Sequence, residues 1–272
     1  MHSSPCGTLG HSNLGASMTQ SGPPTPRHRG IYLLPNLFTT GGLFAGFYAI
    51  IAASAGQFAD ASIAVFVAAL LDGLDGRIAR MTGTQSEFGT QYDSLADLVS
   101  FGMAPALVMY HWSLSGLKLV SPLWGKVGWS LAFLYAACAA LRLARFNTQV
   151  GTVDKRYFIG LASPAAAGLM MSFVWLATDN QFSGDQLRWV APFVTAFAAL
   201  MMVSRFRFYS FKTLPLGDRV PFIAVLIAVG VFVALAIDPP GVLFLITGIY
   251  ALSAPTVWLL ARLRRARSST SE

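Results

Sequence analysis

Four aspartates lie at the edges of two long apolar stretches of the chain. Asp72 and Asp75 come at the end of the first stretch, and Asp93 and Asp97 come at the start of the second. An acidic residue at the centre of a membrane-spanning helix costs about 2.5–3.5 kcal/mol. Four unpaired ones would cost on the order of 10 kcal/mol, which is comparable to the whole stability of an ordinary domain. Something in the folded protein must therefore compensate them.

The spacing of these aspartates predicts that the four carboxylates meet. At about 100° per residue, the first helix carries on one face Asp72, Asp75, Gly76 and Ala79. The second helix carries on one face Gly89, Asp93 and Asp97. A short turn joins the helices, and four converging carboxylates without cations are electrostatically untenable. Oxygen ligands suit Mg²⁺ or Mn²⁺, and four carboxylates are enough to hold two such ions. The expected metal ligands are Asp72, Asp75, Asp93 and Asp97.

Helix capping and ion pairing are the alternative explanation for the aspartates. Arg77 and Arg80 are the nearest cations in the sequence, but two arginines cannot neutralise four carboxylates. The small residues Gly76, Ala79 and Gly89 share the acidic faces and leave room for a bulky ligand against the backbone. Close packing of the two helices explains these small residues equally well.

The composition of the chain places these helices in a bilayer. Its 272 residues are 54% hydrophobic and only 11% charged, whereas a soluble domain carries about 25% charged residues. The net charge of +7 is typical of some nucleic-acid-binding proteins, but the chain has no long basic run and no nucleic-acid-binding motif. A span needs about 20 mostly apolar residues. The sequence predicts eight spans, over roughly 33–56, 60–81, 91–113, 127–148, 158–178, 188–204, 220–237 and 241–261. We therefore expect an all-α integral membrane protein.

The basic residues orient these spans. Of the 19 Lys and Arg residues, all but Lys118, Lys126 and Arg188 fall on one side of the predicted spans. Cytoplasmic loops carry the excess of Lys and Arg, so we expect both termini and the aspartates to face the cytoplasm. Residues 1–29 are predicted to form a disordered cytoplasmic tail, and residues 263–272 form a second, short tail.

The acidic motif resembles the signature of the CDP-alcohol phosphatidyltransferase family. The chain reads Asp72-x-x-Asp75-Gly76-x-x-Ala79-Arg80, eight residues, then Gly89-x-x-x-Asp93-x-x-x-Asp97, and it matches every defined position of that signature. The resemblance implies a six-helix core around a polar cavity open to the cytoplasm, here residues 30–215. Residues 216–262 would add two transmembrane helices. A homodimer is expected on the same ground.

The same resemblance implies roles for individual residues. It implies metal binding by Asp72, Asp75 and Asp93, with Asp97 as the general base and a further metal contact. Asp93 and Asp97 are thus the expected catalytic pair. Contacts to the CDP-lipid donor are implied or expected for Asp72, Gly76, Ala79, Arg80 and Gly89.

A narrower resemblance, to the bacterial phosphatidylserine synthases, covers residues 31–215. It rests on the runs Leu34–Thr39, Asp93–Gly102, Arg142–Thr148 and Phe158–Ala167. One departure is Ala162, where proline is expected, and it should change loop stiffness rather than chemistry. The resemblance implies transfer of the phosphatidyl group from CDP-diacylglycerol to L-serine in the bacterial cytoplasmic membrane, giving phosphatidylserine and CMP.

Two further groups of polar residues lie at the predicted cytoplasmic ends of spans. Arg142, Arg145 and Asn147 could bind the serine carboxylate or a phosphate, because Arg forms bidentate contacts with either anion. Anchoring of a helix end is the alternative. The second group consists of Asn36, Thr39 and Thr40. These side chains could contact phosphate or orient an aspartate, although helix capping and packing explain them equally well.

Other functions remain open at this point. A sister enzyme that uses glycerol 3-phosphate, inositol or inositol phosphate would carry the same aspartates. A cation transporter could also place four carboxylates in a membrane cavity, but it would not need the interleaved glycines, alanine and arginine. A purely structural membrane protein would not retain such costly acids.

Overall fold

The computed structural model describes residues 33–82, 86–148, 157–209 and 222–268, which are almost entirely helical. The four longest helices are α1 (Leu33–Ser54), α2 (Phe58–Thr82), α5 (Pro122–Thr148) and α9 (Pro239–Ser268). The shorter ones are α3 (Glu87–Asp97), α4 (Ala104–Trp112), α6 (Ser163–Asp179), α7 (Val190–Val203) and α8 (Phe222–Ile237). A π-helix, η2 (Leu98–Met103), joins α3 to α4, and a 3₁₀ helix, η3 (Leu114–Leu119), leads to α5. Two short strands, β1 (Tyr157–Ile159) and β2 (Arg207–Tyr209), pair antiparallel.

Eight helical segments coincide with the eight predicted spans, once α3, η2 and α4 are taken as one continuous rod. One difference is at α6, which begins at Ser163 rather than near residue 158. The chain before it pairs as β1, and Gly160 then turns with a φ of 83°. That left-handed conformation suits glycine and cannot be part of a right-handed helix. Pro164, in the first turn of α6, fits a helix start.

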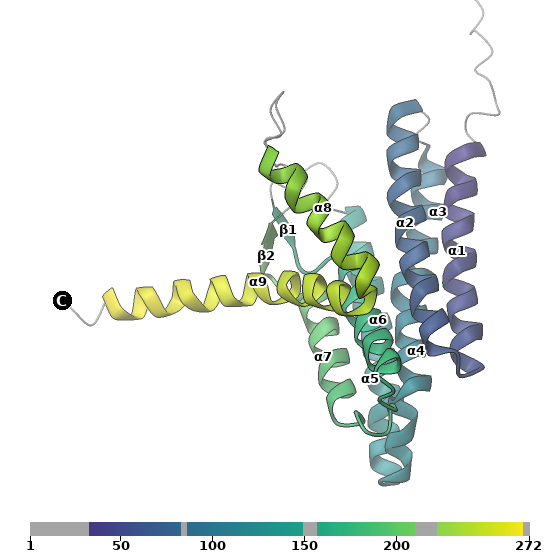
Figure 1. Cartoon of the computed structure of the whole chain (residues 1–272), viewed down its shortest axis with the longest axis vertical. Coiled ribbons are helices and arrows are strands. Elements are labelled where there is room, and N and C mark those ends of the chain that lie inside the picture. Colours follow the sequence, from purple (N-terminus) through teal and green to yellow (C-terminus); the bar gives the residue numbers. More distant parts are fainter. Residues whose placement is uncertain (1–32, 83–85, 149–156, 210–221, 269–272) are drawn as a thin grey trace, which may run out of the picture.

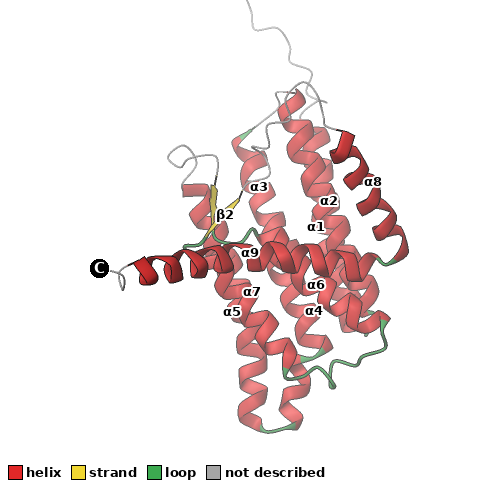
Figure 2. Ribbon diagram, turned by 60° about the vertical axis from the view of Figure 1, so that its left-hand side comes forward, coloured by secondary structure: helices red, strands yellow, loops and turns green. Residues whose placement is uncertain are grey.

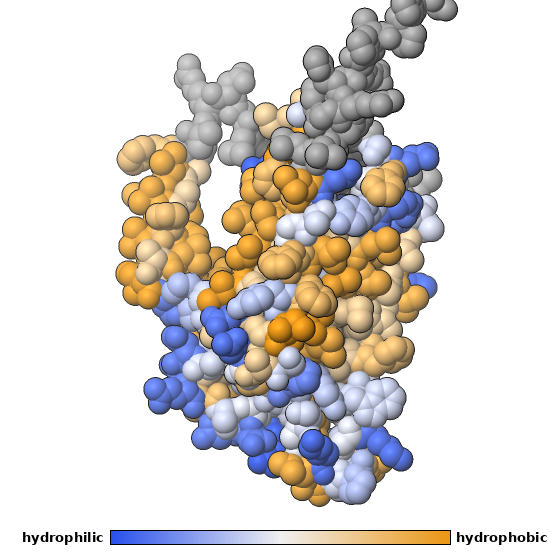
Figure 3. All heavy atoms as spheres, turned by 90° about the vertical axis from the view of Figure 1, so that its right-hand side faces the viewer, coloured by the Kyte–Doolittle hydropathy of each residue, from blue (hydrophilic) through white to orange (hydrophobic). Residues whose placement is uncertain are grey.

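The outer faces of the bundle are apolar. On α1, Phe44, Phe47 and Ile51 are 70%, 58% and 51% exposed. Figure 3 shows apolar side chains dominating the middle of this face, with hydrophilic residues toward its ends. Among the described residues, three helices are long and apolar enough to cross a membrane, and α7 and α8 are shorter apolar helices. Exposed apolar area on this scale marks a membrane-facing surface. The protein is an all-α integral membrane protein.

Small side chains fill much of the interior. α6 lies behind α9 in the bundle (Figure 2), and most of its residues are buried. Buried alanines line the contact between α1 and α2, among them Ala49, Ala53, Ala61 and Ala68. Small residues let helix backbones approach closely, which is how helices associate where no water drives them together.

The two C-terminal helices stand apart from the rest. α9 runs across the bundle, whereas α1 and α2 run along it (Figure 1). It rests on α6, where Ser172 and Thr247 share a hydrogen bond of 3.3 Å and Phe173 contacts Phe244. α8 buries none of its side chains. Both helices are apolar. That residues 216–262 add two transmembrane spans remains a prediction.

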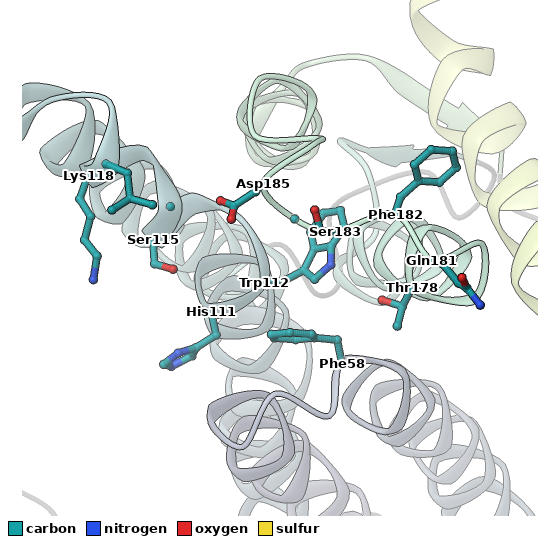
Figure 4. Close-up of a pocket in the computed structure, with 13 residues that line it drawn as sticks. Phe58, His111, Trp112, Ser115, Lys118, Thr178, Gln181, Phe182, Ser183 and Asp185 are labelled. Atoms are coloured by element: carbon teal, nitrogen blue, oxygen red, sulfur yellow. The ribbon is translucent and has the colours of Figure 1, made fainter.

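A cavity of about 560 Å³ opens at one end of the bundle. Figure 4 shows His111, Trp112 and Asp185 around it, with Phe58 from the start of α2. Asp75 lies 17 residues further along α2, roughly 25 Å away at 1.5 Å per residue. This cavity is therefore distinct from the space around the aspartates.

Candidate active site

The structure brings aspartates from α2 and α3 together. One carboxylate oxygen from each of Asp72, Asp75 and Asp93 lies within 4.8 Å of the others. Asp75 is buried, and the other two are half-buried. The predicted meeting of the two acidic helix faces is thus confirmed. Carboxylates this close repel one another strongly unless a cation or proton lies between them.

Asp97 joins this cluster from its edge. It falls outside the group of three, but its side chain shares a hydrogen bond with Asp72 and feels the charges of Asp93 and Asp75. All four aspartates line one small cavity of about 10 Å³, together with Thr39, Gly42, Ala68, Ala96, Ser100 and Phe101. That volume is about one water-sized sphere. An ion-sized space lined by four carboxylates fits a hard divalent cation, whose preferred ligands are oxygens.

Residues of α1 hold the acidic cluster from the side. Thr39 Oγ1 donates a 2.8 Å hydrogen bond to Asp75 Oδ2, and both residues are buried. Of the two roles open to Thr39, the structure therefore supports orienting an aspartate. Thr40 Oγ1 bonds the backbone oxygen of Asn36 and lies 2.9 Å from the hydroxyl of Tyr92 on α3. These contacts tie α1 to both acidic helices.

The two glycines of the motif differ in their surroundings, and only Gly76 borders open space. A Cβ on Gly76 would meet nothing within 4 Å. On Gly89 it would lie 3.1 Å from Ser86 Oγ and 3.5 Å from Asn36 Oδ1. Arg80 is exposed, and its Nε donates to the Gly76 backbone oxygen at 2.7 Å. Ala79 lies on α2 between them, but its surroundings fall outside the described part of the chain.

A cationic side chain from α5 faces the acidic cluster. Arg142 is close enough to Asp97 for their charges to attract, and its Nη1 donates to Ser163 Oγ at 2.7 Å. Its Nε is buried and has no acceptor among the described residues. Asn147 Nδ2 donates to Ser94 Oγ at 3.0 Å, next to Asp93 on α3. Arg145 is half-buried, and no contact within the described chain brings its side chain to the aspartates.

Several structural features of the site were not predicted from the sequence. The π-helix η2 begins directly after Asp97, and such π segments occur often at functional sites. Within it, Ser100 Oγ donates to the Gly42 backbone oxygen at 3.0 Å. A Cβ on Gly46 would lie only 2.6 Å from that same Oγ. This close approach of α1 to η2 fixes the far wall of the small cavity.

At position 162, where proline was expected, the alanine adopts the backbone φ angle of a proline. Ala162 is the N-cap of α6, with φ −62° and ψ 138°. Proline fixes φ near −65°, so the alanine holds the backbone angle that a proline would impose. The backbone at position 162 is therefore one that proline could also adopt.

Comparison with known proteins agrees with this geometry. Residues 32–203, more than half of the chain, match the CDP-alcohol phosphatidyltransferase family. A CDP-diacylglycerol–serine O-phosphatidyltransferase of Helicobacter pylori is 38% identical over 231 residues, which are 84% of this chain and 92% of that protein. The Mycobacterium tuberculosis protein of the same name is 38% identical over 182 residues, 64% of this chain and 60% of that protein. An archaetidylserine synthase of Methanothermobacter thermautotrophicus is 32% identical over 63% of this chain and 67% of its own length. The chain belongs to the CDP-alcohol phosphatidyltransferase family.

Proposed function

We propose that this protein is a CDP-diacylglycerol–serine O-phosphatidyltransferase. The single observation that carries the proposal is the convergence of the four motif aspartates on one ion-sized cavity. The relatives named for this activity, at 38% identity over most of the chain, support serine as the acceptor.

The donor side of the site is assigned to the acidic cluster and its open border. Asp72, Asp75 and Asp93 would hold Mg²⁺ or Mn²⁺, two ions in all, with a further contact from Asp97. When bound, such ions neutralise the diphosphate and favour departure of CMP. The open backbone at Gly76 gives the cytidine diphosphate a surface to lie against. Five residues complete the proposed CDP-lipid contacts: Ala79, Arg80, Gly89, Asn36 and Thr40.

The reaction is an in-line displacement at the lipid-side phosphorus. The serine hydroxyl oxygen forms the new P–O bond, and the P–O bond to CMP breaks. Asp97 accepts the hydroxyl proton as general base. Because a hydroxyl is a far weaker acid than a carboxylic acid, proton transfer is concerted with bond formation. Asp97 suits this role because it stands at the edge of the cluster, on the side that Arg142 faces.

The acceptor is recognised by the cationic side of the site. Arg142 presents a buried Nε that has no acceptor among the described residues, and a serine carboxylate oxygen would satisfy it. An unmade hydrogen bond at a buried donor costs about 1–3 kcal/mol, so a ligand with an anionic oxygen is favoured there. Asn147 and Arg145 form the outer part of this subsite.

The cellular setting follows from the charge distribution. The excess of Lys and Arg on the side of the aspartates supports a cytoplasmic active site and cytoplasmic termini in a bacterial inner membrane. The family match to residues 32–203 supports a core domain over residues 30–215. The predicted tail 1–29 lies outside the described residues. Of the predicted tail 263–272, the structure describes residues 263–268, which continue α9 as helix. A homodimer remains the expected assembly.

CMP release tests the proposal. Purified protein is supplied with CDP-diacylglycerol and Mn²⁺ or Mg²⁺, and with serine, glycerol 3-phosphate, inositol or inositol phosphate in separate reactions. We expect release that depends on serine and on metal. Release with another acceptor would keep the family and overturn serine. No release from folded protein would leave the cluster as a binding or cation-transport site.

A further inference from the structure

We propose that Ser163 is a positioning residue that sets the selectivity for a carboxylate-bearing acceptor by fixing the guanidinium of Arg142. This proposal adds a residue to the acceptor site described above, and it rests on the proposed function. Ser163 lies outside the aspartate motif, in the first turn of α6.

The hydroxyl of Ser163 is committed to Arg142 rather than to its own helix. A serine at a helix start usually caps the helix by accepting from its first backbone N–H groups. Here the N-cap is Ala162, which has no capping side chain, and Ser163 Oγ instead accepts from Arg142 Nη1 at 2.7 Å. Ser163 is fully buried, with 0% of its surface exposed. No water competes for this bond from the Ser163 side.

This contact leaves one edge of the guanidinium for a ligand. A guanidinium is planar and offers its donors along two edges, one formed by Nη1 and Nη2 and the other by Nε and Nη2. Since Nη1 is held by Ser163, the Nε edge is turned away from α6, and Nε is buried without an acceptor. A carboxylate binds such an edge through two parallel hydrogen bonds. Asp97 is close enough for its charge to attract the same guanidinium, so an acceptor bound to Arg142 would have its hydroxyl near the general base.

Loss of the Ser163 hydroxyl should therefore loosen Arg142 without touching the donor side. For Ser163→Ala we expect the serine KM to rise roughly 10-fold, the low end of the effect of one hydrogen bond to a charged group, because the charge of Arg142 itself remains. The KM for CDP-diacylglycerol and the kcat at saturating serine should stay within about twofold of the wild type, because only the one hydrogen bond to Arg142 is lost. Preference for serine over ethanolamine, which lacks the carboxylate, should fall by the same factor as the KM rises.

Two further variants separate positioning from a general effect on folding. Ser163→Thr keeps the hydroxyl and should restore most of the serine affinity. Ser172→Ala removes another fully buried hydroxyl of α6, one bonded to the Leu169 backbone and to Thr247. It should leave the serine KM unchanged, and thermal unfolding of all three proteins in detergent controls for stability.

The outcomes are decisive in either direction. A serine KM within twofold of wild type in folded Ser163→Ala overturns the proposal, as does an equal rise in the KM for CDP-diacylglycerol. If the wild-type protein uses glycerol 3-phosphate instead of serine, the proposed function fails. Selectivity for a carboxylate then fails with it, whereas the effect of Ser163→Ala on the KM for that phosphate still tests whether Ser163 positions Arg142, so the two failures are distinguishable.

Discussion

The acidic half of the site, on α2 and α3, and its cationic half, on α5 and α6, are held in different ways. Asp72, Asp75 and Asp93 come from neighbouring helices of one hairpin and crowd within 4.8 Å of each other. Arg142 stands alone on the other side, and one hydrogen bond to Ser163, 21 residues away, fixes it. The acidic half is thus redundant in charge, whereas the cationic half depends on single contacts.

This difference separates chemistry from selectivity. Changes in the acidic half should affect metal and the chemical step, whatever acceptor is offered. Changes in the cationic half should affect the acceptor alone. Substitutions in each half, with matched controls, test that division.

The largest effect is expected where the two halves meet. Asp97→Asn keeps the shape of the side chain and removes the proton acceptor, so kcat for CMP release should fall by about 10²–10⁴-fold. Binding of CDP-diacylglycerol should be largely spared. Asp60→Asn, exposed in the first turn of α2, is the matched control. If the variant loses donor binding as strongly as turnover, Asp97 is chiefly a metal ligand and the division between base and ligands is wrong.

The cationic half should show a selective loss of acceptor affinity. Arg142→Gln retains a polar side chain but removes the charge, and a charged hydrogen bond is worth about 1.5–3 kcal/mol, or roughly 10- to 150-fold in serine KM. The KM for CDP-diacylglycerol should change little. Arg188→Gln, at the opposite end of the bundle, serves as the control. An unchanged serine KM would show that Arg142 does not bind serine and would favour its role as an anchor of the helix end.

A smaller effect on metal binding is expected from α1. Thr39→Val keeps the volume of the side chain and removes the donor that orients Asp75. Loss of such an outer partner typically costs about 10- to 100-fold in metal affinity or activity. The Mn²⁺ concentration for half-maximal CMP release should therefore rise, and Thr39→Ser should restore it. The control is Thr195→Val, since Thr195 is equally buried but bonds only its own helix at Ala191. An unchanged metal requirement would show that Asp75 needs no support from α1.

The smallest effect on activity is expected from the packing behind the cavity. A Cβ at Gly46 would lie 2.6 Å from Ser100 Oγ and 2.7 Å from its Cα, so the backbones must separate. Overpacking of this kind costs about 1–3 kcal/mol, and Gly46→Ala should lower the thermal unfolding midpoint while leaving serine selectivity intact. Gly248→Ala, where a Cβ meets nothing within 4 Å, should not destabilise. Equal midpoints for the two variants would contradict the close approach of α1 to η2.

The acidic half could be predicted from the sequence because helix geometry alone places it. Residues spaced by three and four share a helix face, so Asp72 with Asp75 and Asp93 with Asp97 converge once a short turn joins their helices. The eight helical segments followed in the same way from the lengths of the apolar stretches. Local spacing was sufficient for both.

The rest of the site depends on tertiary packing, which leaves no local pattern. Ser163 looks like an ordinary helix-capping serine in the sequence, and its bond to Arg142 exists only because α5 and α6 cross there. The π-helix after Asp97 and the path of α9 across the bundle likewise reflect packing against other helices. Thr39 carried two possible roles until its distance to Asp75 was known.

The most direct test of the central claim follows labelled L-serine into lipid. Wild-type protein stripped of metal with EDTA is given CDP-diacylglycerol, labelled serine and then Mn²⁺ or Mg²⁺, beside an Asp93→Asn variant of matched fold. We predict that labelled phosphatidylserine and CMP form one for one, only after metal is restored, and that the variant forms neither. Labelled lipid that persists without metal or in Asp93→Asn, or none at all from folded wild-type protein, would contradict the account.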